Sequence, residues 1–311
     1  MKQKIFNGII VTISIFVLME LLIKKSLIYL SIMSALNLWV YNLIPSLFPF
    51  FIISDILINY NITSYIPNII KNFCKQVFNI SDDMLTILIL SMISGFPSNA
   101  RNTRTLYDKG LIDENEANHI LIFSHFANPV FILTTVAVFF FNDQRVGIIL
   151  LITHYLSNII LGICSRNKAN YKSGKNNNSF KYNDFGNVLV LSIKRAVDTI
   201  LTICGIIVVF LMLSTIIINT FNFNIYNQMI IKGIFEITIG IESLSKLPIG
   251  MSYKLVIASM ILAFGGISVH VQVLSQIAGT KIKYIYFLIG RMYQMIIAGI
   301  LTYIAIILLR I

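Results

Sequence analysis

The chain of 311 residues is strongly apolar, with 57% hydrophobic and only 12% charged residues. Soluble domains carry about 25% charged residues, so this composition excludes an ordinary soluble protein. The formal net charge of +11 could suggest nucleic acid as a partner. We attribute the positive charge to the bias of Lys and Arg toward the cytoplasmic loops of membrane proteins. We therefore expect the lipid bilayer as the partner of this chain, and no nucleic acid.

Taken in chain order, charge-free runs cover 26–54, 84–100, 120–142, 146–165, 199–231, 255–280 and 292–309. A helix needs about 20 apolar residues to cross a hydrocarbon core about 30 Å thick. The sequence therefore predicts an all-α polytopic membrane protein. Spans are expected near 5–23, 36–58, 119–141, 146–164, 192–218, 254–277 and 284–308. The first, within 1–28, has no small-residue cleavage site after it and is expected to be an uncleaved helix.

The two halves of the chain resemble each other. Met84–Gly95 aligns without gaps to Met229–Gly240, and further weak matches follow in the same order. We predict two repeats, 29–164 and 191–311, joined by a basic cytoplasmic linker at 165–190. With 84–104 and 229–247 as re-entrant helical hairpins, each half has three crossings and the second half is inverted. Inverted repeats are typical of alternating-access transporters.

The first hairpin contains a helix break beside positive charge. Gly95 and Pro97 break the helix, and backbone that leaves a helix inside a bilayer must be buried in protein or line a cavity. A half-helix N-terminus beside two arginines one turn apart suits a carboxylate or phosphate. An ordinary Gly-Pro turn at the membrane surface is the alternative. The substrate-binding residues expected here are Ser98, Asn99, Arg101 and Arg104.

Two further breaks lie inside charge-free runs. Asn128-Pro129 interrupts a helix, and Asn128 is a candidate binding residue, while His125 is the best candidate there for a titrating group. Gly265-Gly266 permits an unwound or closely packed segment. Polar groups deep in a span usually face the bundle interior, although simple helix packing is the alternative for both breaks. The binding residues expected after the second break are Ser268, His270 and Gln272.

Glu236 lies in an otherwise apolar segment, where an acid is expected to have a partner. It could bind a coupling cation, titrate with a proton as His125 or His270 could, or pair with Arg291. Gly240, in the same segment, is expected to break the helix.

Several stretches together resemble the sporulation integral membrane protein YlbJ family, whose members carry a nucleoside-recognition Gate domain. They are Pro45–Phe50, Ser94–Arg101, Lys109–Leu111, Asn128–Ile132, Phe235–Gly240 and Phe264–Gln272. The resemblance implies a membrane core like that of concentrative nucleoside transporters, with two re-entrant hairpins and two broken helices. It also implies a dipicolinate-type dicarboxylate substrate and a bacterial membrane, namely that of the forespore.

We therefore expect a transporter or facilitator for a small anionic solute, with no enzymatic step and neither cofactor nor metal. No paired acid motif, metal cluster or P-loop is evident, and the three scattered cysteines form no zinc or disulfide pattern. The alternatives are a nucleoside transporter, or a structural membrane protein of the developing spore. A homo-oligomer or sporulation membrane partners would fit either.

Overall fold

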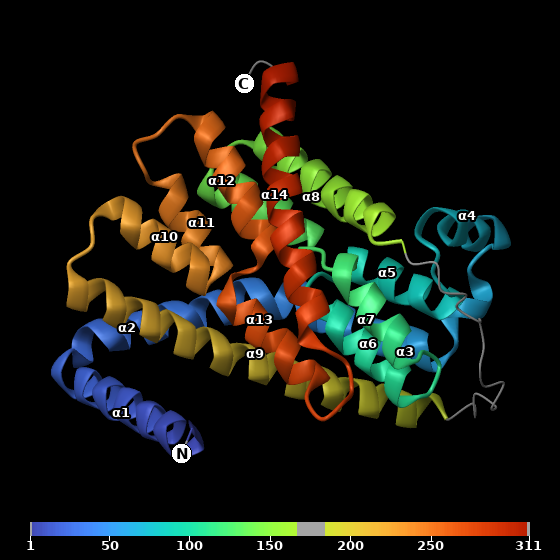
Figure 1. Ribbon diagram of the computed structural model, residues 1–311, viewed down its shortest axis with the longest axis horizontal. Coiled ribbons are helices and arrows are strands. Elements are labelled where there is room, and N and C mark those ends of the chain that lie inside the picture. The colour runs from blue at the N-terminus through green and yellow to red at the C-terminus, as the bar shows by residue number, and fades with distance from the viewer. Residues whose placement is uncertain (1, 167–183, 310–311) are drawn as a thin grey trace.

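The computed structural model describes residues 2–166 and 184–309, and this part of the chain is helical with no strand (Figure 1). The elements in chain order are α1 (Lys2–Ile23), α2 (Lys25–Leu38), η1 (Trp39–Leu43), α3 (Ile44–Asn59), η2 (Ile62–Tyr65), α4 (Asn68–Phe78), α5 (Asp82–Ser94), α6 (Ser98–Asp108), α7 (Glu114–Phe123), η3 (Phe131–Phe140), α8 (Gln144–Cys164), α9 (Phe185–Phe221), α10 (Ile225–Phe235), α11 (Ile237–Ser245), α12 (Met251–Phe264), α13 (Gly266–Ile277) and α14 (Tyr284–Leu309).

Within the described residues, five helical segments are long and apolar enough to cross a membrane: Lys25–Asn59, Gln144–Cys164, Phe185–Phe221, Met251–Ile277 and Tyr284–Leu309. Their outer faces carry large, exposed apolar side chains. Leu308, for example, is 76% exposed, which is expected where lipid rather than water is the solvent. The predicted all-α polytopic membrane fold is confirmed, whereas the inverted relation of the two halves stays a prediction.

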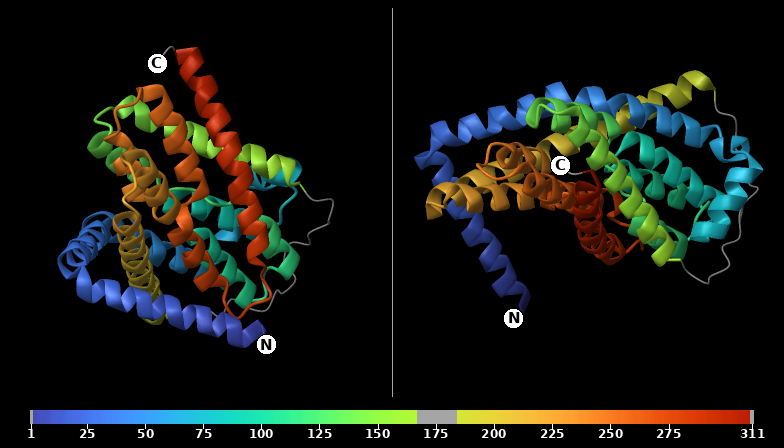
Figure 2. Two further views of the ribbon diagram at one scale, coloured as in Figure 1. Left: turned by 60° about the vertical axis from the view of Figure 1, so that its left-hand side comes forward. Right: turned by 90° about the horizontal axis from the view of Figure 1, so that it is seen from above.

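The boundaries of some spans differ from those expected. The segment 119–141 is not one continuous helix, because 124–128 is non-helical between α7 and the π-helical stretch η3. Helix α9 begins at Phe185, earlier than the expected 192, so the linker predicted at 165–190 includes the start of a helix, and its residues 167–183 lie outside the described part. Helix α1 lies at the edge of the bundle, where it contacts α2 and α9 (Figures 1 and 2).

Both predicted hairpins are present as pairs of short helices. Helices α5 and α6 pack against each other and turn at Gly95–Pro97, and α10 and α11 do the same around Glu236. The longest of these helices, α5, has 13 residues, which is too short to cross a hydrocarbon core alone. This length favours hairpins that enter and leave on one side of the membrane.

The expected helix break at Gly240 is wrong. The break lies at Glu236, whose backbone is extended (φ −148°, ψ 130°), and Gly240 is inside α11. Gly240 faces Gly233 of α10, and a Cβ on Gly240 would overlap the Gly233 backbone. The missing side chain therefore serves close packing of the two hairpin arms, which is the other common use of glycine in membrane helices.

Helices α2 and α3 continue into each other through η1, and this long segment runs beside α9 (Figure 2, right). Leu47 and Phe51 from α3 pack with Ala196 and Ile200 from α9 in one apolar cluster. The indole of Trp39 donates a hydrogen bond to the carbonyl of Ile200 at 2.8 Å. The π-helical turn η1, which holds Trp39, directly precedes the prolines of α3, where missing N–H groups disturb regular helix geometry.

Candidate functional site

The two hairpin tips and the two broken spans meet at the centre of the molecule. Phe96, at the first tip, stacks on His125 from the break after α7, with ring centroids 5.1 Å apart. Phe96 and Asn128 line a small cavity together with Thr238 from the second tip. At the other break, a Cβ on Gly266 would lie 3.3–3.4 Å from backbone atoms of Phe235 and Glu236. Each hairpin tip is therefore close to the break of a broken span.

Asn128 forms hydrogen bonds that connect the break after α7 with α3 and with the end of α5. Its side-chain oxygen accepts hydrogen bonds from the N–H groups of Val130 and Phe131, at 2.8 and 3.3 Å, so it caps the helix that follows the break. Its side-chain amide donates to the carbonyls of Ser46 and Ser94, both at 3.2 Å. Capping an interrupted helix is a strong local stabilisation. In this conformation the polar atoms of Asn128 are thus occupied by the protein.

Arg291, on α14, is fully buried and directs its guanidinium at the freed carbonyls of both broken spans. It donates to Ile122 at the end of α7 at 3.0 Å, and more weakly to His125 and to Ala263 at the end of α12. Its other partners are the side-chain oxygens of Asn158 and Gln294. A cation beside the C-terminal ends of two helices offsets their negative dipoles.

Glu236 does not pair with Arg291 in the described structure. Its carboxylate instead caps α11, accepting a hydrogen bond from the N–H of Ile239 at 3.0 Å and from the hydroxyl of Thr238 at 3.3 Å. The interpretation as an ion pair with Arg291 is therefore wrong, because the start of α11 supplies donors to an acid that needs them. The roles of Glu236 in cation binding or proton transfer stay predictions.

Several buried polar side chains at this centre have no hydrogen-bond partner in the described structure. They are both amide atoms of Asn99, the hydroxyls of Ser124 and Ser268, and both ring nitrogens of His125. Burying such groups unpaired is costly, and native structures usually provide a reason for each. His270 differs, since its ring bonds to the hydroxyl of Tyr284 at 2.6 Å and to the carbonyl of Phe264 at 3.0 Å.

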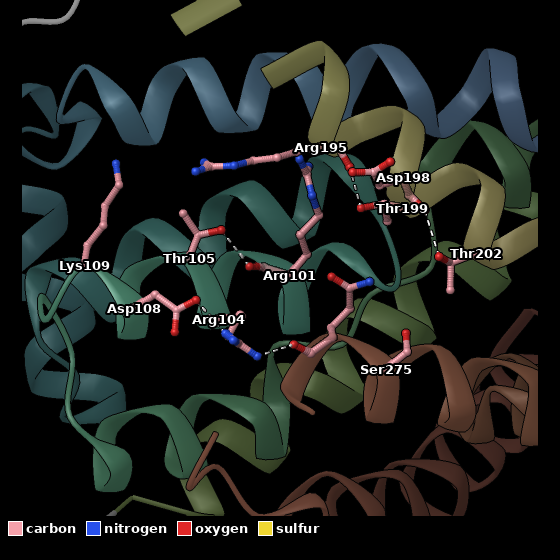
Figure 3. A pocket seen from close by; sticks show the side chains of 11 residues that line it. Arg101, Arg104, Thr105, Asp108, Lys109, Arg195, Asp198, Thr199, Thr202 and Ser275 are labelled. Carbon is pink, nitrogen blue, oxygen red and sulfur yellow. Dashed lines mark hydrogen bonds and ion pairs between the residues drawn. The ribbon is translucent and has the colours of Figure 1, made fainter. Parts of the chain in front are cut away.

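A cavity of about 530 Å³ lies beside the first hairpin, between α6, α9 and α13 (Figure 3). Its walls hold more positive than negative side chains. Burial lowers the pKa of the Lys109 ammonium, and the neighbouring charge of Arg195 lowers it further. The lining residues are Arg101, Arg104, Thr105, Asp108, Lys109, Arg195, Asp198, Thr199, Thr202, Ser275 and Gln276.

The two predicted arginines lie at different depths in this cavity. Arg101 is 4% exposed; it donates to the carbonyl of Phe51 at 2.9 Å and lies 3.2 Å from a carboxylate oxygen of Asp55. Arg104 lies closer to the rim. It bonds to Asp108 at 2.6 Å and to the carbonyl of Ala278 at 2.6 Å. Arg101 is therefore the deep cation and Arg104 the outer one.

The structure brings only part of the predicted site together. Arg101 and Arg104 line the cavity, and Asn128 lies between the hairpin tips. The other expected binding residues are buried within α6 and α13 and line no described cavity: Ser98, Asn99, Ser268, His270 and Gln272. Sequence reasoning missed two residues: Arg195, which lines the cavity, and Asp55, which is buried beside the cavity-lining Arg101 and Arg195. A single acid in an otherwise apolar span was the available signal for Asp55.

The fold and the site define a polytopic helical membrane protein whose two helical hairpins and two broken spans enclose a polar centre. Residues 40–144 match the family model described as nucleoside recognition (Gate). The chain is also 28% identical to sporulation integral membrane protein YlbJ of Bacillus subtilis (strain 168), over 86% of this chain and 74% of that protein. These findings confirm the resemblance that the sequence motifs indicated. No solved structure matches.

Proposed function

We propose that this protein is a membrane transporter or facilitator for a small anionic solute. The observation that carries the proposal is the basic cavity beside the first hairpin. Four of its lining side chains are basic and two are acidic: Arg101, Arg104, Lys109 and Arg195 against Asp108 and Asp198. A concave site with an excess of positive charge concentrates anions.

The position of the cavity supports a transport role. With the N-terminus in the cytoplasm, the expected spans place the segments of its four basic residues on the cytoplasmic side, as the bias of Lys and Arg favours. Under that topology the cavity opens toward the cytoplasm. Its volume of about 530 Å³ lies within the range of about 300–1,000 Å³ seen for small-molecule sites. The buried, unpartnered groups of Asn99 and Ser268 lie on two of the helices that form its walls. They are suited to bind a solute after a conformational change exposes them.

The substrate class that fits best is a compact dicarboxylate of the dipicolinate type. Arginine binds carboxylates through paired donors. In this cavity, one carboxylate of the solute could bind the deep arginine and the other an outer arginine. The similarity to a protein named for sporulation supports a place in the forespore membrane. There, such a protein would carry dipicolinate into the developing spore.

The direct test is flux in proteoliposomes that contain the purified protein, with dipicolinate and uridine as alternative solutes. Dipicolinate flux should exceed that of empty liposomes, and Arg195→Gln should lower it about tenfold or more, since one lost charge-assisted carboxylate contact is worth about 1.5–3 kcal/mol. Lys246→Gln is the matched control, because Lys246 is an exposed cation directly after α11 whose ion pair in the described structure is with Glu242. Equal flux in both variants would contradict the site.

A nucleoside is the second candidate substrate, favoured by the description of the matching family model. A neutral nucleoside gains little binding energy from the four basic side chains of the cavity, so we expect uridine flux to be smaller than dipicolinate flux. Uridine flux that is larger and insensitive to Arg195→Gln would reverse this order. If neither solute moves, a structural role in the sporulation membrane becomes the better explanation.

A further inference from the structure

We propose that Asp55 is an internal carboxylate that occupies the anion site of the cavity, and that an incoming anion displaces it from its two arginines. This inference rests on the proposed function and deepens it. It assigns to one acidic side chain the control of anion affinity and of the contact between α3 and α9.

Asp55 bridges two cations that come from different helices. It is fully buried on α3. One carboxylate oxygen lies 3.2 Å from Nη2 of Arg101 on α6, and the other lies 3.6 Å from Nη1 of Arg195 on α9. Figure 3 shows the side chains of Arg101 and Arg195 close together at one side of the cavity. A carboxylate of a bound solute would find its best partners at the same place.

The carboxylate of Asp55 is held by ion pairs without hydrogen bonds in the described structure. Neither of its oxygens accepts a hydrogen bond, and Nη2 of Arg101 donates none. The pair is thus held by charge without the directional bonds that normally offset the cost of burying two ions. A solute carboxylate free to orient could form paired donor contacts with Arg101 or Arg195. The side chain of Arg195 is 51% exposed, so an anion in the cavity can reach it before Asp55 leaves.

The exchange has a mechanical consequence. Asp55 is a link between α3, α6 and α9, and an anion held by the two arginines would leave α3 without its ionic tie to α9. Trp39, the only tryptophan in the chain, reports on the same interface, because its indole donates to Ile200 of α9 at 2.8 Å. Anion binding should therefore change the fluorescence of Trp39.

The first experiment measures dipicolinate binding to the purified protein in detergent by titration calorimetry. Asp55→Asn should bind dipicolinate about tenfold more tightly than the wild type, because an internal competitor that fills the site in nine molecules of ten lowers the apparent affinity about tenfold. Asp198→Asn is the matched control, since Asp198 lines the same cavity but has no ion pair in the described structure. It should tighten binding by about twofold or less through the general change in charge.

The second measurement compares the Trp39 fluorescence of the wild type with that of two Asp55 variants. Saturating dipicolinate should shift the Trp39 emission of the wild type to the value that Asp55→Asn shows without any anion. Asp55→Glu, which retains a carboxylate, should keep the emission of the unliganded wild type.

The outcomes separate this inference from the proposed function. If the wild type carries dipicolinate flux but Asp55→Asn binds no more tightly than Asp198→Asn, the displacement of Asp55 is wrong and the transport function stands. Unchanged Trp39 emission at saturating dipicolinate would overturn the link to the α3–α9 contact. If the wild type shows neither flux nor binding and Asp55→Asn binds no dipicolinate either, both proposals fail.

Discussion

Gly95, at the tip of the first hairpin, is a position where a single added methyl group should strongly destabilise the protein. Its backbone has φ +78° and ψ −177°, a region that only glycine occupies readily and that costs other residues about 1–3 kcal/mol. A Cβ there would lie 2.6–2.8 Å from three atoms of Asn128. Forcing such an overlap into a packed core costs about 1–3 kcal/mol more. Gly95→Ala should therefore destabilise the protein by about 2–6 kcal/mol.

Thermal unfolding in one detergent is a suitable assay, with Gly205→Ala as the control. Gly205 lies within α9 and has no atom within 4 Å of a Cβ built there, so alanine should stabilise by about 0.5–1 kcal/mol. Domains of 150–250 residues lose about 2–4 °C of melting temperature per kcal/mol, so a loss of about 10 °C is expected for Gly95→Ala. If Gly95→Ala melts within about 2 °C of the wild type, the contact between the hairpin tip and Asn128 is not as described.

Three other substitutions test the centre by the same assay. Arg291→Met leaves two backbone carbonyls, at the ends of α7 and α12, without a donor and should cost about 2–6 kcal/mol of stability. The control Arg104→Met, at the cavity rim, should cost less than about 1 kcal/mol. Equal losses of stability would refute the role of Arg291 in stabilising the two helix ends. Gly240→Ala should cost about 1–3 kcal/mol because it pushes α11 away from Gly233, and a neutral result would mean that the arms separate freely. Glu236→Gln weakens the cap of α11 and should cost about 0.5–2 kcal/mol; a gain in stability would show that the buried carboxylate is strained.

Much of the fold could be predicted from the sequence, because membrane residence, helix breaks and short hairpins leave local signals. Gly95 and Pro97 cannot continue a helix, and Gly265 adopts a left-handed φ of +95° at the break before α13. The failures come from signals with two meanings. The glycine at 240 could break a helix or let two helices approach, and only the position of α10 decides between them. The extended backbone at Glu236 has no glycine or proline to mark it.

The site was harder to predict than the fold. Arg101 and Arg104 were identified because positive charge next to a helix break is visible in the sequence itself. The bridge from Asp55 to Arg195 joins α3 to α9, and no local pattern records that these helices pack side by side. Asp55 could have been singled out as a lone acid in an apolar span, but its partners follow only from the tertiary arrangement.

The guanidinium of Arg291 has a consequence for energy coupling. In many transporters with interrupted helices, the exposed carbonyls at the breaks bind an ion taken from solution, and that ion is released on the other side. Here the positive charge at the ends of α7 and α12 belongs to the chain and cannot be released. If the protein transports a solute as proposed, both interruptions would keep their counter-charge throughout the cycle, and no ion gradient would be spent to maintain them.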